Sequence, residues 1–470
     1  MSEHILFLTG RLAEKNLQRV LDAMQPAPFR HSVLALSLQV AGLMTSDMIL
    51  RRLADTDGAD TNGIDRVMLP GRCRGNLEAL SSRFGVPFVR GPDDLKDLPR
   101  YFGREAAPID LTRHDVRIFA EITDAPNMAM MAILDQANDY RNAGADVIDL
   151  GCLPETPFIH LEEAVARLHA AGFAVSVDSM DPQELLRGGR AGADFLLSLK
   201  EDTLWIADEV ASTPVLIPST PSDMQSLYRA IETMENNGRD YLVDPVIEPI
   251  HFGFTESLVR YRDLRKKLPA VKILMGTGNL TELTEADTLG IQALLMGIIS
   301  ELRITNILTT QVGAHASGVI READAARRVM YAAREAGDLP QGFGETLLAM
   351  HSLDPFPWST EEIAATAAEI KDPSFRVQIS PDGLHVYNRE GMRTATDPFK
   401  LFAHLGLEHD GSHAFYLGVE LARAQIAWQL GKRYVQDREL DWGVAQLRAS
   451  TEADAQIVAS ARAGKSKAEP

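Results

Sequence analysis

The chain has 470 residues, of which 45% are hydrophobic and 24% charged, so it is long enough for several globular domains. Its formal net charge of -19 argues against nonspecific binding to nucleic acid or to an anionic membrane surface. The only two cysteines, Cys73 and Cys152, support neither a disulfide framework nor a zinc or iron–sulfur site.

Two further patterns concern location. No apolar run approaches the roughly 18 residues that a membrane span needs. The first residues enter a strand pattern without the basic and apolar regions of a secretory signal. We therefore expect a soluble, cytoplasmic protein.

The first hundred residues alternate between short apolar runs and helical patterns. Strands are predicted at residues 4–9, 32–40, 64–69 and 86–90, and helices at 13–24, 46–53 and 77–84. This order predicts a Rossmann-like α/β domain with an open parallel sheet over residues 1–100. Arg72 and Arg74 lie in its glycine-flanked loop 70–76, which could hold a phosphate at a helix start or could be a surface turn with two solvated arginines.

A polar linker at residues 96–115 leads into a second domain, predicted over residues 115–337. Its expected strands lie near residues 117–123, 146–150, 173–178, 194–199, 214–218, 240–244, 271–275 and 291–296. Helices fill the gaps, and the last is expected over 321–336. Eight strands and eight helices predict a (β/α)8 TIM barrel.

From residue 339 prolines and glycines mark a second linker, and a small α+β domain is expected over residues 350–450. Runs at 374–379 and 384–388 flank a Ser-Pro-Asp-Gly turn and predict a hairpin, followed by a helix over 412–430. Residues 460–470 are expected to form a disordered tail. His413, Tyr416, Tyr434 and Asp437 either form a second site or pack this domain.

Polar residues at the carboxyl ends of barrel strands share one mouth and are candidates for ligand binding. They are Glu121, Asp124, Asp149, Asp178, Ser198, Lys200, Asp244, Thr277 and Asn279. Several carboxylates facing one mouth suit a ligand with many N–H donors, such as an aminopyrimidine, because a carboxylate accepts two parallel hydrogen bonds. The alternative for any one Asp is a helix N-cap, which is how we interpret Asp181 before Pro182.

A loop rich in small residues, 311–321, precedes the last barrel helix. TIM barrels often bind phosphate at this place, and His315, Ser317 and Arg321 could bind an anionic group there. The alternative is an N-cap at Ser317 and a solvated arginine.

Four segments of the barrel carry a family resemblance. Residues 147–151 (Val-Ile-Asp-Leu-Gly), 175–179 (Val-Ser-Val-Asp-Ser), 191–194 (Ala-Gly-Ala-Asp) and 242–245 (Leu-Val-Asp-Pro) resemble the IDIGG, ISVDT, AGAD and LLDPG patterns of the pterin-binding barrel family. That family contains dihydropteroate synthases and methyltetrahydrofolate-dependent methyltransferases. The resemblance covers residues 117–335 and implies that Asp178 and Asp244 bind a pterin ring.

Three departures distinguish the chain from ordinary dihydropteroate synthases. Ser198 stands where they carry Asn, residues 277–279 (Thr-Gly-Asn) replace their Ser-Arg-Lys, and residues 296–299 lack their Arg-x-His. Asn279 instead matches the pterin-facing Asn of the methyltransferase branch.

The flanking domains, with residues 413–418 and 434–437, resemble the dihydropteroate synthase-related proteins of tetrahydromethanopterin biosynthesis. This resemblance implies condensation of a 6-hydroxymethyl-7,8-dihydropterin diphosphate with 4-(β-D-ribofuranosyl)aminobenzene 5'-phosphate, releasing pyrophosphate. For this reaction we expect catalytic roles for Asp149, Asp178 and Asp244 and Mg²⁺ with the diphosphate. Barrels of the family commonly pair, so the resemblance also implies a homodimer.

Two alternatives to this synthase remain open. One is a pterin-dependent methyltransferase, although the flanking domains lack an Asp-x-His-x-x-Gly cobalamin signature. The other is a non-catalytic pterin-binding or assembly protein, which the missing Lys and Arg would suit.

Overall fold

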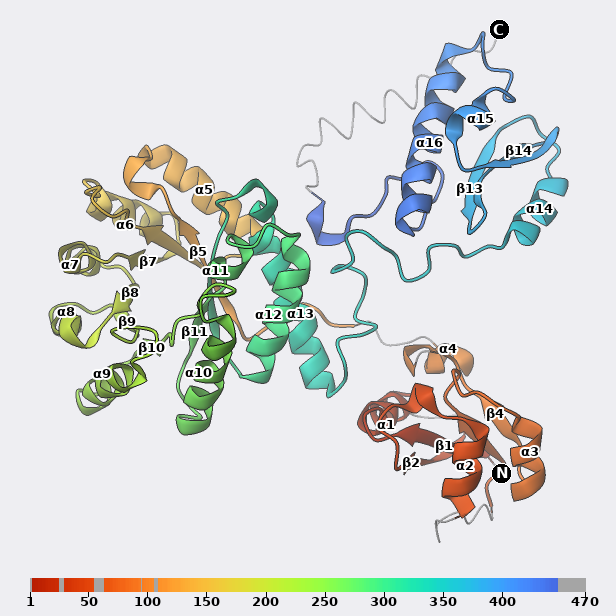
Figure 1. The fold of residues 1–470 in the computed structure, drawn as a ribbon, viewed down its shortest axis with the longest axis horizontal. Helices are drawn as coiled ribbons and strands as arrows, with labels where there is room; N and C mark the ends of the chain where they lie inside the picture. Colours follow the sequence, from red (N-terminus) through yellow and green to blue (C-terminus); the bar gives the residue numbers. More distant parts are fainter. Residues whose placement is uncertain (1, 25–28, 55–62, 94, 105–108, 447–470) are drawn as a thin grey trace.

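The computed structural model describes residues 2–24, 29–54, 63–93, 95–104 and 109–446, which form three bodies in chain order (Figure 1). These are an open parallel sheet with helices, an eight-stranded barrel, and a small antiparallel sheet with helices. The α/β fold class and the three-part organisation are as predicted. The predicted tail at 460–470 lies outside the described residues. Within them, no helix is both long and apolar enough to cross a bilayer.

The first body is an open sheet of strand order β2-β1-β3-β4, parallel throughout. One face packs on α1 and α4 through Leu17, Leu21 and Leu98, and the other face packs on α2 and α3. The elements are β1 (His4–Gly10), α1 (Glu14–Ala23), β2 (Arg30–Leu36), η1 (Ala41–Leu43), α2 (Ser46–Ala54), β3 (Arg66–Leu69), α3 (Leu77–Phe84), β4 (Phe88–Arg90), η2 (Leu95–Asp97) and α4 (Leu98–Tyr101). The predicted Rossmann-like sheet is confirmed.

The second body is a barrel of eight parallel strands, ordered β10-β9-β8-β7-β6-β5-β12-β11. The amide of Val243 donates to the carbonyl of Lys272 at 3.0 Å, which joins the two ends of the sheet. Its strands are β5 (Arg117–Ile122), β6 (Val147–Gly151), β7 (Ala174–Asp178), β8 (Phe195–Leu199), β9 (Thr213–Leu216), β10 (Leu242–Val243), β11 (Leu274–Gly276) and β12 (Asn306–Thr310).

Helices cover the outside of the barrel (Figure 1). They are η3 (Ala125–Asn127), α5 (Met130–Ala143), α6 (Leu161–Ala170), α7 (Pro182–Arg190), η4 (Glu201–Thr203), α8 (Trp205–Glu209), α9 (Met224–Asn236), α10 (Phe254–Lys267), α11 (Gly278–Thr281), α12 (Thr288–Glu301), η5 (Ala314–Ala316) and α13 (Val319–Ala336). Asp181 caps α7 by accepting from the amide of Gln183 at 2.8 Å, as predicted.

The predicted eighth strand at residues 291–296 is wrong, because this segment lies inside α12. The eighth strand is β12, which begins ten residues after that segment ends. A short apolar run in a buried helix cannot be told from a buried strand by periodicity alone. The loop 311–321 nevertheless directly follows the true eighth strand.

Side chains at alternate strand positions fill the barrel interior in layers. The middle layer is apolar and contains Phe119, Val147, Leu197, Val215, Leu242, Leu274 and Leu308. Below it, Arg117 donates to Asn306 at 2.9 Å and lies over the ring of Phe195. Two residues further along five of the strands, the inward side chains become polar: they are Glu121, Asp149, Ser176, Asp244 and Thr310. The interior therefore ends in a polar layer at the carboxyl ends of the strands.

Arg327 of α13 joins several elements at the amino end of the barrel, and it is only 3% exposed. Its guanidinium donates to the carbonyls of Val116 (2.6 Å) and Gly144 (2.9 Å). It also pairs with the carboxylates of Asp146 (2.5 Å) and Asp324 (2.6 Å). One buried side chain thus connects α13 to the segments that enter β5 and β6.

The third body contains α14 (Thr360–Ala368), β13 (Arg376–Ser380), β14 (Gly383–Asn388), β15 (Gly391–Ala395), α15 (Pro398–Phe402), α16 (Gly411–Leu430) and η6 (Gly443–Ala445). The predicted hairpin and long helix are confirmed, and β15 adds a third antiparallel strand. Tyr434 donates to Glu420 at 2.6 Å and Tyr416 to Asp437 at 2.8 Å. These contacts favour the packing role over a second site.

The first body contacts the end of α13. The side chain of Asn16 binds Asp338, and Arg19 binds the carbonyl of Ala336. Because α13 runs back from the carboxyl end of β12, these contacts lie at the end of the barrel remote from its polar layer.

Candidate functional site

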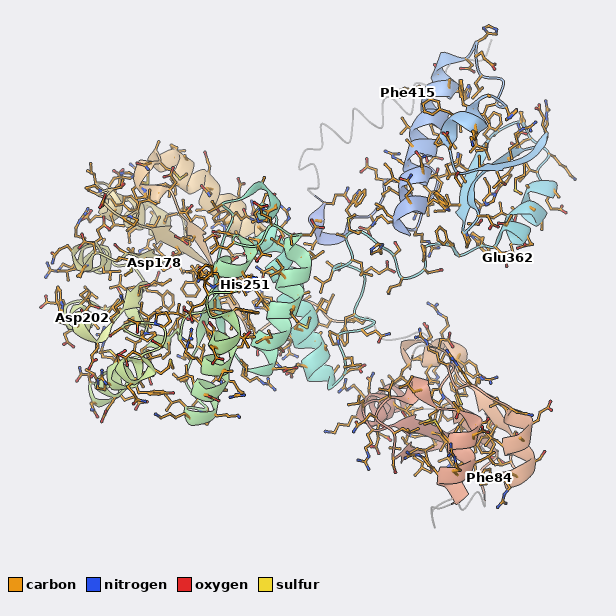
Figure 2. The ribbon with its side chains drawn as sticks, in the orientation of Figure 1. Phe84, Asp178, Asp202, His251, Glu362 and Phe415 are labelled. Carbon is orange, nitrogen blue, oxygen red and sulfur yellow. The ribbon has the colours of Figure 1, made fainter. Side chains whose placement is uncertain are left out.

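Four acidic side chains gather at the carboxyl ends of β5, β6, β7 and β10. They are Glu121, Asp149, Asp178 and Asp244, and Figure 2 labels Asp178 within the barrel. The charge of Asp178 contributes to raising the pKa values of the other three carboxyls. Glu121, Asp149 and Asp244 therefore all lie within electrostatic reach of Asp178 at a single mouth.

Asp149 is completely buried. The hydroxyl of Ser176 on β7 donates to its Oδ1 at 2.5 Å, whereas its Oδ2 is buried without a hydrogen-bond partner. Burial first, and then the charges of Asp178 and Glu121, raise the pKa of Asp149 well above its ordinary value. A buried acceptor without a donor is costly, so Oδ2 is a place where a ligand could supply one.

Asp178 ends β7 and accepts a hydrogen bond from Ser198 at 3.0 Å. Ser198 has a φ of 75°, and the register between β8 and β9 shifts between Leu196 and Leu199. Such bulges redirect a side chain, here toward the carboxylate of Asp178. Burial raises the pKa of Asp178, and the Ser198 hydrogen bond opposes that rise.

Asp244 follows β10 and is held through one oxygen. Its Oδ1 accepts from the hydroxyl of Tyr261 at 2.5 Å and from the amide of Val246 at 2.7 Å. Burial raises the pKa of Asp244 to about 6, and these hydrogen bonds lower it. Because both bonds use Oδ1, the second oxygen is left for a ligand.

The loop after Asp244 is held in an uncommon conformation. Val246 has a φ of 62° and His251 a φ of 70°. Positive φ is uncommon for any residue but glycine and is rarest for β-branched residues such as Val246. Arg260 of α10 donates to the carbonyls of Pro245 and Val246 and pairs with Glu248 at 2.9 Å. These bonds fix the loop, and strain of this kind is concentrated at functional sites.

Glu121 lies over Gly151. A Cβ at Gly151 would lie 2.4 Å from Oε1 of Glu121, so a larger residue at this position would displace the carboxyl. Burial, followed by the charges of Asp178 and Glu282, raises the pKa of Glu121 to about 8. Glu121 is therefore mainly protonated at neutral pH in the absence of a ligand.

The raised pKa of Glu121 predicts how stability depends on pH. Between about pH 4.5 and pH 8 the folded protein holds a proton that the unfolded chain releases, so stability falls as pH rises through this window. Glu121→Gln should make the fall shallower, by on the order of 5 kcal/mol over the window. Urea unfolding of the barrel between pH 5 and pH 9 measures this. The exposed Glu163→Gln is the control, and equal slopes for the two variants would contradict the assignment.

Three other predicted residues lie at the mouth or its rim. Asp124 is exposed and accepts from Asn127 at 2.8 Å, a local contact within its own turn. Asn279 is also exposed, and its amide donates to the carbonyl of Ile247 at 2.7 Å. Lys200 follows β8, and among the described residues its ammonium has no ion-pair partner. Asn279 is thus bonded to the loop after β10, and Asp124 is bonded within its own turn.

The predicted phosphate group of His315, Ser317 and Arg321 does not assemble around one point. The ring of His315 lies 3.1 Å from the carbonyl of Thr281. Arg321 lies over Gly318 and lines a hollow on the outer side of α13 with Asn142 and Thr346. Ser317 is exposed between them, and Gly318, not Ser317, is the N-cap of α13. Sequence proximity suggested a cluster, but consecutive turns direct these side chains to different neighbours.

Three residues of the site were not predicted from the sequence: Tyr261, Ser176 and Glu282. Tyr261 and Ser176 each donate to one of the predicted aspartates. Glu282 has a buried Oε1 without a partner, and burial raises its pKa. Ser176 could have been found, because it is the inward residue two positions before Asp178. Tyr261 and Glu282 come from helices and loops whose orientation no sequence pattern indicates.

Comparisons with known proteins match different parts of the chain. Residues 3–93 match a family of unknown function, DUF6513. The chain is 24% identical over 524 residues to an uncharacterized protein of Methanocaldococcus jannaschii, covering 93% of this chain and 98% of that protein.

Solved structures of dihydropteroate synthases are similar to about half of the chain. The Yersinia pestis enzyme in a sulfonamide complex is 16% identical with a TM-score of 0.39, covering 48% of this chain and 96% of that one. The Xanthomonas albilineans enzyme in complex with 7,8-dihydropteroate is 18% identical with a TM-score of 0.36, covering 48% and 94%.

Proposed function

We propose that the barrel mouth binds a pterin ring and that the protein is a pterin-related transferase. The specific reaction proposed is condensation of a 6-hydroxymethyl-7,8-dihydropterin diphosphate with 4-(β-D-ribofuranosyl)aminobenzene 5'-phosphate, releasing pyrophosphate. The specific substrates come from the sequence resemblance. The binding of the ring is supported by the geometry of the mouth.

The observation that carries the proposal is the pair Asp178 and Asp244. Each is held by a neighbouring hydroxyl, and the two lie within electrostatic reach at one mouth. The mouth therefore has an excess of hydrogen-bond acceptors. The aminopyrimidine edge of a pterin offers parallel N–H donors, which a carboxylate accepts in pairs.

The reaction would join two positioned molecules at a methylene carbon. The lone pair of the arylamine nitrogen attacks that carbon while its bond to the diphosphate oxygen breaks, and the bonding electrons leave with pyrophosphate. The nitrogen then releases one proton to solvent water. An arylamine is a free base at neutral pH, so positioning and charge stabilisation do most of the catalysis.

We further propose that Mg²⁺ accompanies the diphosphate and neutralises part of its charge. The described residues contain no group of three or more His, Cys, Asp or Glu side chains placed to hold a metal unaided. Mg²⁺ commonly needs only one or two carboxylates beside substrate phosphates and water. Asp149 and Glu282, each with an unpartnered buried oxygen, are the residues that would hold it.

A turnover assay tests the proposal. The full-length protein would be incubated with the pterin diphosphate and Mg²⁺, together with either the ribosylated arylamine phosphate or 4-aminobenzoate, and pyrophosphate release would be measured. We expect release with the ribosylated amine and loss of release in Asp244→Asn.

Other outcomes of the assay favour the alternatives. Release only with 4-aminobenzoate would overturn the substrate assignment. Pterin binding without release would favour a non-catalytic binding protein. Methyl transfer from a methylated pterin to a corrinoid would favour the methyltransferase. Absence of pterin binding would overturn the whole proposal.

A further inference from the structure

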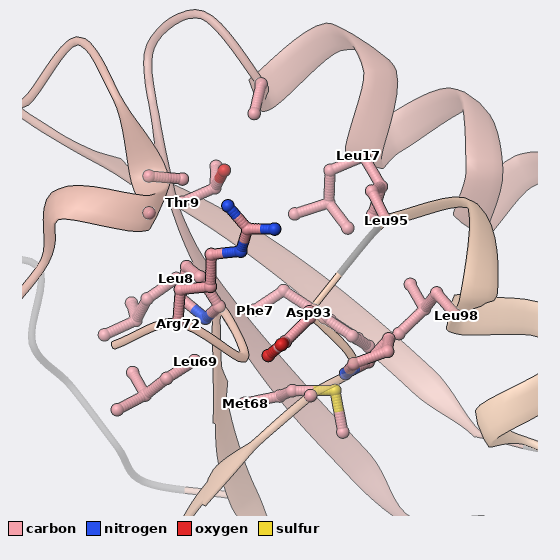
Figure 3. A pocket seen from close by; sticks show the side chains of 16 residues that line it. Phe7, Leu8, Thr9, Leu17, Met68, Leu69, Arg72, Asp93, Leu95 and Leu98 are labelled. Carbon is pink, nitrogen blue, oxygen red and sulfur yellow. The ribbon is translucent and has the colours of Figure 1, made fainter. Parts of the chain in front are cut away.

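The first body contains a hollow of about 140 Å³ that the barrel chemistry does not use (Figure 3). Its walls come from the last residues of β1 and β3 and from the segments that follow β1, β2, β3 and β4, so it lies at the carboxyl end of the sheet. In the strand order β2-β1-β3-β4, the chain leaves β1 toward one edge and returns to β3 on the other side. The hollow therefore lies at the topological switch point, where open parallel sheets bind ligands.

The hollow is mainly apolar. Phe7, Leu17, Met68, Leu95 and Leu98 contribute to its walls. A dry apolar cavity of similar size accepts a benzene-sized molecule. One six-membered ring is therefore the size of group that fits.

Two polar groups on the wall have few partners in the protein. Arg72 forms no hydrogen bond or ion pair with the described residues, and its guanidinium extends toward Thr9 (Figure 3). Thr9 is only 3% exposed, and within the described part of the chain its hydroxyl donates only to the carbonyl of Gly10, at 3.5 Å. A guanidinium beside a buried hydroxyl can bind an anionic group through charge-assisted hydrogen bonds.

Asp93 adds a hydrogen-bond acceptor to the wall of the hollow. Its carboxylate lines the same space but forms no ion pair with Arg72. In Figure 3 the carboxylate lies apart from the guanidinium. It can therefore accept a hydrogen bond from a donor elsewhere on the same ligand.

Close backbone approaches shape the hollow. A Cβ at Gly10 would lie 2.7 Å from the amide of Ala41, and one at Gly71 would lie 2.5 Å from the carbonyl carbon of Pro92. Glycine is thus required where the loops after β1 and β3 meet their neighbours. The walls are formed by tightly packed backbone, so the hollow is a fixed feature of the domain.

From these features we infer that the first body is a binding domain for a compact ring compound that carries an anionic group. The ring occupies the apolar hollow, the anionic group meets Arg72 and Thr9, and a donor such as an amine or hydroxyl meets Asp93. The anionic group is a carboxylate or a phosphate. This inference does not depend on the function proposed for the barrel.

Calorimetric titration of the full-length protein tests the inference with four probes: benzoate, 4-aminobenzoate, phenyl phosphate and inorganic phosphate. We expect at least one ring-bearing probe to bind more tightly than inorganic phosphate. Comparison of benzoate with phenyl phosphate identifies the anionic group, and comparison of benzoate with 4-aminobenzoate reports on Asp93. Failure of every ring-bearing probe to bind at millimolar concentration would overturn the inference.

Matched variants assign the binding to this hollow. Arg72→Gln should weaken binding about tenfold or more, because a hydrogen bond to a charged group is lost. Arg74→Gln removes the same charge from the same exposed loop but not from the hollow, and should leave affinity unchanged. Equal effects of the two variants, or no effect of Arg72→Gln, would overturn the assignment.

A second variant fills the hollow without changing charge. The nearest atom to a Cβ at Gly42 is Cδ of Arg72 at 4.0 Å, so Gly42→Val fits the fold while occupying ligand space. Binding of the ring-bearing probes should weaken, with an unchanged melting temperature. Undiminished binding in a folded Gly42→Val protein would place the ring elsewhere.

Discussion

Asp178→Asn should reduce pterin affinity by about a hundredfold or more. The substitution keeps the shape of the side chain, but an amide accepts only through its oxygen and presents an NH₂ group to the donors of the ligand. It also removes the charge that strengthens both hydrogen bonds. Titration of the full-length protein with 6-hydroxymethylpterin measures the effect.

The matched control for this experiment is Asp202→Asn. Asp202 is exposed in η4, outside the barrel interior, and Figure 2 labels it away from Asp178. Asp202→Asn makes the same change in net charge as Asp178→Asn, but it should leave the affinity for the pterin unaltered. If Asp178→Asn binds the pterin as tightly as the wild type, the carboxylate pair is not the ligand site.

Arg327→Leu should be the most destabilising single substitution in the barrel among those considered. It leaves two carboxylates and two carbonyls without their buried donor, at a cost of about 3–5 kcal/mol. For a domain of this size that corresponds to a melting temperature lower by roughly 10 °C. Differential scanning calorimetry of the barrel transition measures it.

Arg167→Leu is the comparison for Arg327→Leu, because Arg167 pairs with Glu163 on the exposed face of α6. An exposed pair of this kind contributes about 0–1 kcal/mol. Similar losses in the two variants would mean that the contacts of Arg327 are no stronger than a surface ion pair.

The parallel strands that end in aspartates were predictable because their apolar runs are short, bounded and followed by polar loops. The eighth strand was not. β12 has the sequence Asn-Ile-Leu-Thr-Thr, and its polar residues Asn306, Thr309 and Thr310 are buried in the barrel. A search for apolar runs passes over such a strand and selects the more hydrophobic α12 in its place.

The residues of the candidate site likewise fall into those that the sequence predicts and those that it does not. Strand position alone placed Asp149, Asp178 and Asp244 together, since the carboxyl ends of parallel strands meet at one mouth. The partners of these residues depend on tertiary geometry. Tyr261 reaches Asp244 from a helix 17 residues further along the chain. The different neighbours of His315 and Arg321 likewise depend on how the turns after β12 are oriented.

The crowding of Glu121 with its acidic neighbours has a consequence for the energetics of ligand capture. With a pKa of about 8, the empty mouth carries bound hydrogen ions at neutral pH. In the proposed complex, a ring that donates N–H groups requires Asp178 and Asp244 to be ionised. Burial raises the pKa of Asp244 to about 6, so ring binding would release a hydrogen ion from Asp244 in mildly acidic buffer. Capture and acidity are therefore linked, and alkaline conditions favour the occupied state.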